Sequence, residues 1–302
     1  DFFFFLSSVP TNVRIYPVDL NGSLESYWEG FQVSPDDYFR LVTTRRLDAM
    51  LNWLFAGGLP SLRTDTTCAI GGSMGGTGTL VFGVRRPNRF AALYPDRPRW
   101  KNAYVTGTII VPKYPTGMVS VPTGSSPKLS HEDGGYSLAD YKNILAYVSN
   151  VANKIPWIGW VCGSNDGTMP WQDQLDAVVA MRIARRGFAF AWNTGDHGTG
   201  PSTYEITNSY PYGTFKIGQG YPLFTNHSGD QDPTVDAVGG INIGLSFRNV
   251  VETTSSWSCE VTSILGARTV DIEPISDVFK TDVTPKSVSI PAANTWVPVS
   301  FI

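Results

Sequence analysis

The sequence has few charged residues and no long apolar run, and each shortage excludes a class of protein. Charged residues make up 16% of the 302, and 23 Lys and Arg against 26 Asp and Glu give a net charge of -3. Binding to nucleic acid or an anionic membrane needs a basic patch, which these scattered charges do not supply. No stretch approaches the roughly 18 apolar residues of a membrane-spanning helix. We therefore expect neither a nucleic-acid partner nor a membrane segment.

Cysteine is also scarce. Cys68, Cys162 and Cys259 are an odd number at wide spacing, which suits neither a disulfide framework nor a zinc site built from close pairs of ligands. We expect all three to be small core residues. Three aspartates gather in 230–236, but their spacing does not match a calcium-binding loop. The sequence therefore predicts no metal and no other cofactor.

Apolar and turn-forming residues are plentiful. Hydrophobic residues reach 42% and aromatic residues 13%, which suffices for a packed core. The 30 Gly and 21 Pro indicate many loops, and with the low charge they are typical of an extracellular enzyme. This length has room for one large domain and a smaller appendage. The chain begins at Asp1 with neither Met nor a signal peptide, so we expect residues to precede it.

Strands alternate with helices in the first two-thirds of the sequence. Val13–Leu20 predicts a strand, and a helix is expected from the Ser34 cap to Gly57. Helices are also expected from Ser73 to Arg86 and over Gln172–Arg186. Short apolar or β-branched runs predict further strands at 66–71, 90–94, 155–162 and 188–192. Because this alternation builds a parallel sheet, we predict an α/β domain over residues 1–205.

The pattern changes after about Gly200. Residues 206–240 are rich in Gly, Pro, Tyr, Asn and Ser without a sustained period, which predicts an ordered loop or linker. From Ile241 to Phe247 apolar and polar residues alternate, as in a half-buried strand. Further strands are expected at 257–262, 268–272, 287–290 and 296–301. We predict that 241–302 form a β-sandwich-like module, which buries apolar faces against the first domain because about 60 residues make a marginal core alone.

The segment Gly71–Gly75 (Gly-Gly-Ser-Met-Gly) has the G-x-S-x-G pattern of a nucleophile elbow. In such an elbow a serine occupies a sharp, strained turn between a strand and a helix, and the glycines remove side chains that would collide. The turn would raise Ser73 above the sheet and place the Met74 backbone N–H where an oxyanion forms. A Gly-rich turn with a bystander serine is the alternative. The β-branched strand before the segment and the helix after it favour the elbow.

A nucleophilic serine needs a base and an acid, which in such folds follow in the chain order Ser, Asp or Glu, His. Asp166 comes after the predicted strand that ends at Cys162, and His197 comes after the next predicted strand. The competing histidine, His131, lies in a polar loop, where a solvated surface residue is the simpler interpretation. Asp196 adjoins His197, but a sequence neighbour rarely faces the ring as required. Asp166 is therefore the preferred acid.

Two residues are weaker candidates for substrate contact. Trp171 follows the Asp166 loop and could line a substrate pocket, where its ring would stack on a sugar or an aromatic acyl group. His227 lies in a polar loop beyond the domain change and could also touch the substrate. Most of the other tryptophans are expected to be core residues.

Taken together, these motifs resemble the α/β-hydrolase superfamily, close to its esterase and prolyl-oligopeptidase-like serine hydrolases. The resemblance covers about residues 13–200. It is carried by the segments Ile70–Gly76, Pro87–Ala92, Gly163–Asp166 and Gly195–Gly198. It implies Ser73 as the nucleophile, His197 as the general base and then acid, and Asp166 as the residue that holds the His197 tautomer.

The chain departs from this family near its beginning. A complete α/β-hydrolase has strands before the one expected at Val13–Leu20, which would then be an interior parallel strand. The family also carries a His-Gly type segment whose N–H is the second oxyanion donor. No such segment precedes Ser73, so we expect that donor upstream of Asp1, with Asn21–Gly22 and Tyr27–Trp28 as alternatives.

We predict a secreted or extracellular serine hydrolase that cleaves a carboxylic ester through an acyl-enzyme. A polysaccharide or another polymer could carry the ester. Two alternatives stay open. A peptidase of the prolyl-oligopeptidase type would share the same triad, and a non-catalytic binding or structural protein could be built on a hydrolase scaffold.

Overall fold

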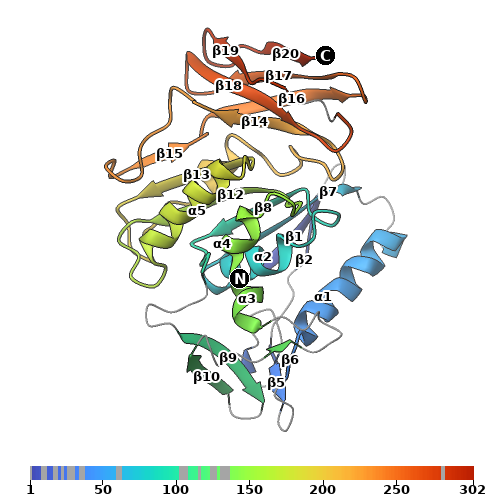
Figure 1. Ribbon diagram of the computed structural model, residues 1–302, viewed down its shortest axis with the longest axis vertical. Coiled ribbons are helices and arrows are strands. Elements are labelled where there is room, and N and C mark those ends of the chain that lie inside the picture. Colours follow the sequence, from blue (N-terminus) through green and yellow to red (C-terminus); the bar gives the residue numbers. More distant parts are fainter. Residues whose placement is uncertain are drawn as a thin grey trace.

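The computed structural model describes residues 41–58, 63–101, 137–279 and 283–302, and the backbone of the strands within 2–40 and 108–129. At its centre is a seven-stranded sheet with the strand order β15-β13-β12-β8-β7-β1-β2 (Figure 1). Four neighbouring strands of this sheet run parallel. They are β7 (Arg63–Gly72), β8 (Ala92–Asp96), β12 (Trp157–Gly163) and β13 (Phe188–Asn193).

Antiparallel strands flank the parallel four on both sides. β15 (Gly239–Ile241) pairs with β13, and β1 (Phe2–Ser7) pairs with β7. The connecting helices are α2 (Met74–Gly83), α3 (Leu138–Lys142), α4 (Ile144–Ser149) and α5 (Trp171–Ile183). The predicted mixed α/β class, with a parallel sheet and separate antiparallel β sheets, is confirmed. Within the ranges given above, no helix combines the length and apolar character that a membrane span requires.

Local patterns located the central elements well. The four strands predicted between residues 66 and 192 correspond to β7, β8, β12 and β13, and the helix predicted over Gln172–Arg186 corresponds to α5. Their ends differ from the predicted ends by a few residues, as is usual where a helix or strand frays.

The prediction for the first strand was wrong. We expected Val13–Leu20 to be an interior parallel strand, but β2 (Asn12–Ile15) is last in the sheet order and pairs antiparallel with β1. Farther along, β3 (Leu20–Asn21) pairs with β4 (Leu24–Glu25) in a separate ribbon. The sequence itself argues against an interior strand, because Pro17 has no backbone N–H to donate to a strand ladder.

The first predicted helix begins later than expected. Helix α1 spans Val42–Trp53, and the predicted first turn instead contains β6 (Tyr38–Arg40). Pairing with neighbouring strands takes residues 38–40 out of the predicted helix. The predicted end is confirmed, because a π-helical turn over Leu54–Gly58 closes the helix with Gly57 at φ 89°. Strand β6 belongs to a five-stranded sheet with β5 (Phe31–Val33), β9 (Thr108–Tyr114), β10 (Gly117–Pro122) and β11 (Lys128–Leu129).

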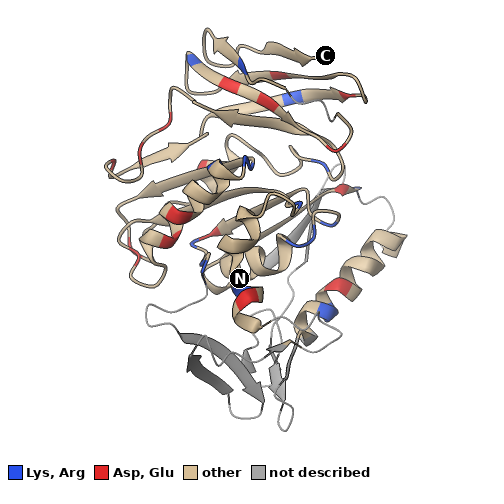
Figure 2. Cartoon of the chain, in the orientation of Figure 1, with Lys and Arg blue, Asp and Glu red and all other residues tan. Residues whose placement is uncertain are grey.

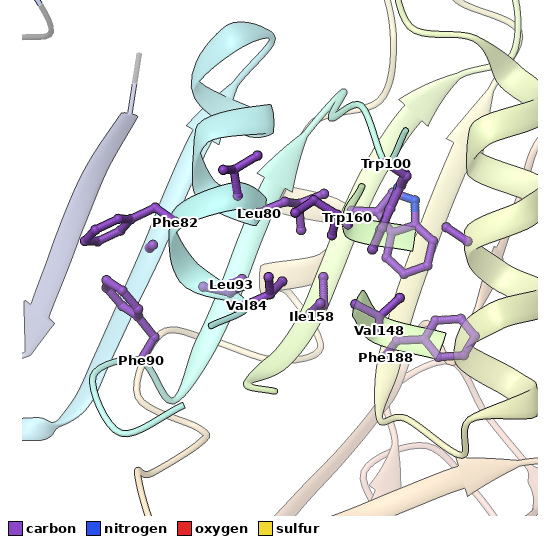
Figure 3. Packing of buried hydrophobic residues seen from close by; sticks show 14 of the residues in the cluster. Leu80, Phe82, Val84, Phe90, Leu93, Trp100, Val148, Ile158, Trp160 and Phe188 are labelled. Atoms are coloured by element: carbon purple, nitrogen blue, oxygen red, sulfur yellow. The ribbon is translucent and has the colours of Figure 1, made fainter. Parts of the chain in front are cut away.

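The two faces of the parallel sheet carry side chains of different size. On the helix-covered face the large rings of Phe188, Phe190 and Trp192 join one core, while the alternate residues Ala189 and Ala191 join a second core on the opposite face. Figure 3 shows the first core, which is filled by helix and strand residues such as Leu80, Phe82, Trp100 and Trp160. The period of two along each strand therefore separates the two cores.

The second core is shared with a β module that covers the sheet (Figure 1). This module has two three-stranded antiparallel sheets. The first contains β14 (Tyr221–Thr225), β18 (Arg268–Ile275) and β19 (Lys286–Ile290), and the second contains β16 (Leu245–Glu252), β17 (Trp257–Ser263) and β20 (Val297–Phe301). The strands predicted at 257–262, 268–272, 287–290 and 296–301 are present. The strand predicted from Ile241 to Phe247 is divided, because residues 242–244 form a turn between β15 and β16. The segment 206–240, which we expected to be a loop, also contains β14, because a short apolar run interrupts its Gly- and Pro-rich sequence. Strand β15, at the end of this segment, joins the central sheet.

Hydrogen bonds and apolar burial join the module to the sheet. The Tyr94 hydroxyl of β8 donates to the Tyr210 carbonyl oxygen at 3.0 Å, and the Tyr210 hydroxyl donates to the Asn242 carbonyl oxygen at 2.9 Å. Burial raises the pKa of both tyrosines well above the usual value. Phe247 and Trp257 of the module share the core of Ala189 and Ala191. The expectation that the module buries apolar faces against the first domain is confirmed.

Trp157, the first residue of β12, offers a test of this shared core. Its ring is stacked on Phe215 with centroids 4.4 Å apart and lies 4.8 Å from the Tyr210 ring. We expect Trp157→Ala to lower the free energy of unfolding by about 3–5 kcal/mol, measured by urea denaturation, because it leaves a large buried cavity. Trp53, which is 55% exposed, provides the control, and Trp53→Ala should change stability by about 0.5 kcal/mol or less. Equal effects of the two substitutions would contradict the shared core.

Candidate active site

Ser73 occupies the turn between β7, which ends at Gly72, and α2, which begins at Met74. Its backbone has φ 57° and ψ −118°, a conformation that residues with a side chain rarely adopt. The Ser73 N–H donates to the Asp96 carbonyl oxygen at 2.9 Å, which ties the turn to the end of β8. This is the sharp strand-to-helix turn that the Gly71–Gly75 pattern predicts.

Close backbone packing surrounds the turn. A Cβ on Gly76 would overlap the Asp96 carbonyl oxygen, so α2 approaches β8 closely because residue 76 has no side chain. Gly163, at the end of β12, has the same role, because a Cβ there would overlap the Gly195 carbonyl oxygen. These two contacts bring the ends of β7, β8, β12 and β13 together at one edge of the sheet.

The structure brings the three principal predicted residues into contact at this edge. His197, on the loop after β13, places Nε2 2.7 Å from the Ser73 Oγ. Its other ring nitrogen, Nδ1, lies 2.7 Å from Oδ2 of Asp166, on the loop after β12. Both distances lie within the range expected for a nucleophile, base and acid in hydrogen-bonded sequence.

Asp166 is held rigidly in this position. Its side chain has no exposed surface, and its Oδ1 accepts hydrogen bonds from the backbone N–H groups of Thr168 and Met169 at 2.8 and 2.9 Å. A carboxylate can only accept a hydrogen bond, so the contact with Asp166 favours the His197 tautomer that carries its proton on Nδ1. The Nε2 lone pair is then free to accept the Ser73 hydroxyl proton. The His197 side chain is 34% exposed, which leaves the ring accessible to a substrate.

Asp196 binds backbone and hydroxyl groups of its own loop, whereas a triad acid binds the histidine ring. Its Oδ1 accepts from the backbone N–H groups of Gly198 and Thr199 and from the Thr199 hydroxyl. These hydrogen bonds, led by the one from Gly198, lower the pKa of the Asp196 carboxyl. Asp196 therefore shapes the loop that carries His197 and does not orient its ring. The other competitor, His131, lies outside the described residues.

Met74 is the first residue of α2, so its N–H is among the first-turn donors that have no acceptor within the helix. The predicted position for an oxyanion donor is thus present beside Ser73. For the second donor, Asn21 lies in β3, paired with β4. The alternatives at Gly22 and at Tyr27–Trp28 fall outside the part of the chain that the structure describes.

Trp171, the first of the two weaker substrate candidates, lies at the start of a helix. Trp171 begins α5, and its ring packs against Phe190 and Trp192 at centroid distances of 5.8 and 6.4 Å, at the margin of the helix-side core. Its role as a substrate contact stays a prediction.

His227 is not at the catalytic edge. It lines a cavity of about 410 Å³ together with Phe188, which begins β13, whereas His197 follows the end of that strand. Its side chain is 2% exposed, and Nδ1 lies 2.8 Å from Oδ1 of Asp230. His227 follows strand β14, which places it away from the Ser73 turn, and its contact with a substrate stays a prediction.

Sequence reasoning missed two residues at this edge, Asp96, which is the last residue of β8, and Arg97, which follows it. The Arg97 Nε and Nη2 donate to the two carboxylate oxygens of Asp96 at 2.7 and 2.8 Å, and Nη1 donates to the His197 carbonyl oxygen. Burial raises the pKa of the Asp96 carboxyl, while the Arg97 guanidinium acts in the opposite direction. The available signal was their position, because they end a strand next to the one that leads to Ser73.

The three cysteines lie in the cores, as expected. Cys68, Cys162 and Cys259 are buried and form no disulfide, and burial raises the pKa of the Cys259 thiol to about 12. Figure 2 shows Lys and Arg interspersed with Asp and Glu along the described elements. Among those same residues, no group of three or more His, Cys, Asp or Glu side chains is placed to hold a metal ion.

Comparison with known proteins adds no relative. No protein-family model matches the chain, and no curated protein matches it significantly. The geometry of the residues at the sheet edge therefore carries the functional interpretation.

The strained backbone of Ser73 can be tested without any assay of activity. Ser73→Ala and Ser73→Gly both remove the hydroxyl, but the glycine also relieves the positive φ, so we expect the glycine variant to be more stable by about 1–2 kcal/mol in urea denaturation. At Ser149, the last residue of α4, the order should reverse, with alanine favoured by up to about 1 kcal/mol. The same order of stability at both positions would argue against strain at Ser73.

Proposed function

We propose that the protein is a serine hydrolase of the α/β-hydrolase type that cleaves carboxylic esters. One observation carries the proposal, namely the hydrogen-bonded series from Ser73 Oγ through His197 to Asp166, with the serine in a strained turn. The parallel strands β7, β8, β12 and β13 and the chain order Ser, Asp, His also support it. A bystander serine has no need of positive φ or of an oriented imidazole.

The proposed reaction uses each of these groups in turn. His197 Nε2 accepts the Ser73 hydroxyl proton as Oγ bonds to the ester carbonyl carbon, and the carbonyl oxygen becomes an oxyanion beside the Met74 N–H. Collapse of this intermediate breaks the carbon–oxygen bond to the alcohol, which takes the proton from His197. Water then attacks the acyl-enzyme by the same steps and releases the carboxylic acid.

Asp166 has a supporting part in this scheme. Its carboxylate stays ionised, keeps the proton on Nδ1 and stabilises the imidazolium that forms when Nε2 is protonated. Three hydrogen-bond donors surround it, from Thr168, Met169 and His197, and they compensate for its complete burial. An extracellular location and a polymer-borne ester are proposed on the low charge and high Gly and Pro content of the sequence.

Replacement of the nucleophile tests the proposal directly. We expect Ser73→Ala to lower kcat for a p-nitrophenyl ester by on the order of 10⁴–10⁶ and to abolish labelling by a fluorophosphonate probe. Ser164→Ala, in the loop after β12, is the matched serine control and should retain labelling. Labelling that persists in Ser73→Ala would show that Ser73 is not the nucleophile. A peptide p-nitroanilide series distinguishes a peptidase, and a wild-type protein inert to every probe would favour a non-catalytic scaffold.

The two neighbouring aspartates provide a second test. Asp166→Asn should lower kcat by about 10⁴, because the amide can present the wrong group to Nδ1 and favour the wrong His197 tautomer. Asp196→Asn keeps an acceptor for the loop N–H groups and should lower kcat by less than about tenfold. Steady-state hydrolysis of the same small ester measures both. A larger loss for Asp196→Asn than for Asp166→Asn would reverse the assignment of the acid.

A further inference from the structure

We propose that Asp96 and Arg97 form a positioning pair that holds the nucleophile turn, the acid strand and the histidine loop in register. The proposal rests on the proposed serine-hydrolase function, since it assigns these residues a role for the same triad. Neither side chain is part of the hydrogen-bonded series Ser73–His197–Asp166, so each acts through residues that are.

The backbone of the pair contacts two of the three segments. The Asp96 carbonyl oxygen accepts from the Ser73 N–H at 2.9 Å and faces Gly76 without room for a side chain. The Arg97 N–H donates to the Val161 carbonyl oxygen of β12 at 2.8 Å, five residues before Asp166. This one dipeptide therefore fixes the spacing between the strand-to-helix turn and the strand that leads to the acid.

The Arg97 side chain contacts the third segment. Its Nη1 donates to the His197 carbonyl oxygen, while its Nε and Nη2 are held by both carboxylate oxygens of Asp96. A Cβ on Gly200, three residues after His197, would lie 3.6 Å from the Arg97 Cδ, so the loop also packs on the arginine stem. A bidentate pair fixes the guanidinium plane, and that plane in turn fixes the His197 backbone.

Two further features favour a functional role. Arg97 has φ 50°, a costly conformation for a residue with a long side chain, and such strain persists where the surrounding structure enforces it. The Arg97 and Asp96 side chains are 20% and 18% exposed, so their charges are weakly screened. Within the part of the chain that the structure describes, Asp166, Asp96 and Asp196 interact electrostatically with His197, and Arg97 binds the His197 carbonyl oxygen. Arg97 cancels the charge of Asp96, which would otherwise add to that of Asp166.

The chain contains a matched pair that separates positioning from simple structural support. Arg86 binds both carboxylate oxygens of Asp48 at 2.6 Å, and its Nη1 donates to the Phe82 carbonyl oxygen at 2.7 Å. Like Arg97, Arg86 therefore binds one carboxylate through two nitrogens and one backbone carbonyl through the third. The Arg86 pair, however, lies at the end of α2 that is remote from Ser73. Arg86→Gln thus removes the same kinds of hydrogen bond without touching the catalytic edge.

The experiment compares Asp96→Asn, Arg97→Gln, Arg97→Lys and the double variant Asp96→Asn/Arg97→Gln with Arg86→Gln and the wild type. Each protein is first checked for folding by circular dichroism and urea denaturation. The steady-state constants kcat and KM are then measured for a small p-nitrophenyl ester. The dependence of kcat/KM on pH gives the acid limb, which is the fall in kcat/KM at low pH. The pH at which the His197 ring takes up a proton is followed by NMR.

The two charge-removing variants should move the acid limb in opposite directions. Loss of the Asp96 anion makes the imidazolium less favourable, so in Asp96→Asn the limb and the ring titration should move to lower pH. Loss of the Arg97 cation makes the imidazolium more favourable, so in Arg97→Gln both should move to higher pH. Each shift should be on the order of a few tenths of a pH unit, as expected for charges several ångströms from the ring. In the double variant the limb should return close to that of the wild type.

The remaining variants should distinguish the effect of the shape of the Arg97 side chain from the effect of its charge. Arg97→Lys keeps the charge but lacks the planar fork, so its acid limb should match the wild type while kcat falls by about 10–100-fold. KM should change by less than about threefold, because the pair does not contact a small ester. Arg86→Gln should leave kcat and the acid limb unchanged and alter stability alone.

Outcomes that contradict the pair can be distinguished from failure of the proposed function. If Arg97→Gln and Arg97→Lys have the kcat and acid limb of Arg86→Gln, the positioning role is wrong although the hydrolase stands. If the wild type shows no Ser73-dependent turnover or labelling, the proposed function is wrong. The NMR titration still decides the electrostatic part in that case, since opposite shifts support the pair and identical shifts refute it. If Arg97→Gln fails to fold, the shift measured for Asp96→Asn, which keeps the shape of its side chain, decides the electrostatic part, and Arg97→Lys decides the geometric part.

Discussion

The contact between the Ser73 turn and the end of β8 is the constraint on which the catalytic edge depends. Ser73 keeps its positive φ because its N–H is bound to the Asp96 carbonyl oxygen and because α2 packs on that same oxygen at Gly76. A serine in a relaxed turn would not present Oγ to His197 Nε2. The free energy spent on this strained turn must come from the surrounding cores, and this links the activity we propose to the packing of the whole sheet.

The sheet provides that packing through two unlike covers. Large rings such as Phe190 and Trp192 fill the helix side, and the small Ala189 and Ala191 let the module approach the other side. In many α/β proteins helices cover both faces. Here two antiparallel β sheets take one of those places, so the module is part of the core that supports β12 and β13. The Asp166 and His197 loops follow those two strands, and Cys68 and Ile70 of β7 belong to the same core, so removal of the module would loosen all three segments that carry the proposed triad.

The sequence was informative where one local pattern determined the outcome. Ser73, Asp166 and His197 were predictable because each follows a short apolar strand, and parallel strands end at a common edge. The other elements depend on pairing between strands that are distant in the sequence. Helix α1 begins after the predicted cap at Ser34 because β6 pairs in a sheet, and β14 forms by pairing with β18 although its segment is rich in Gly and Pro. Asp96 and Arg97 match no motif, and the folded chain alone reveals that Arg97 reaches a carbonyl group 100 residues away.

The charges at the edge explain why an arginine belongs beside a triad. A general base must lose its proton readily near neutral pH, and every ionised carboxylate near the ring opposes that loss. In the proposed mechanism Asp166 is required, because it sets the tautomer, but a second free carboxylate at Asp96 would hold the proton on His197. The bidentate bond from Arg97 removes that excess charge, and the same guanidinium anchors the His197 backbone. One side chain thus satisfies an electrostatic and a geometric requirement, which a lysine or a neutral amide could meet one at a time.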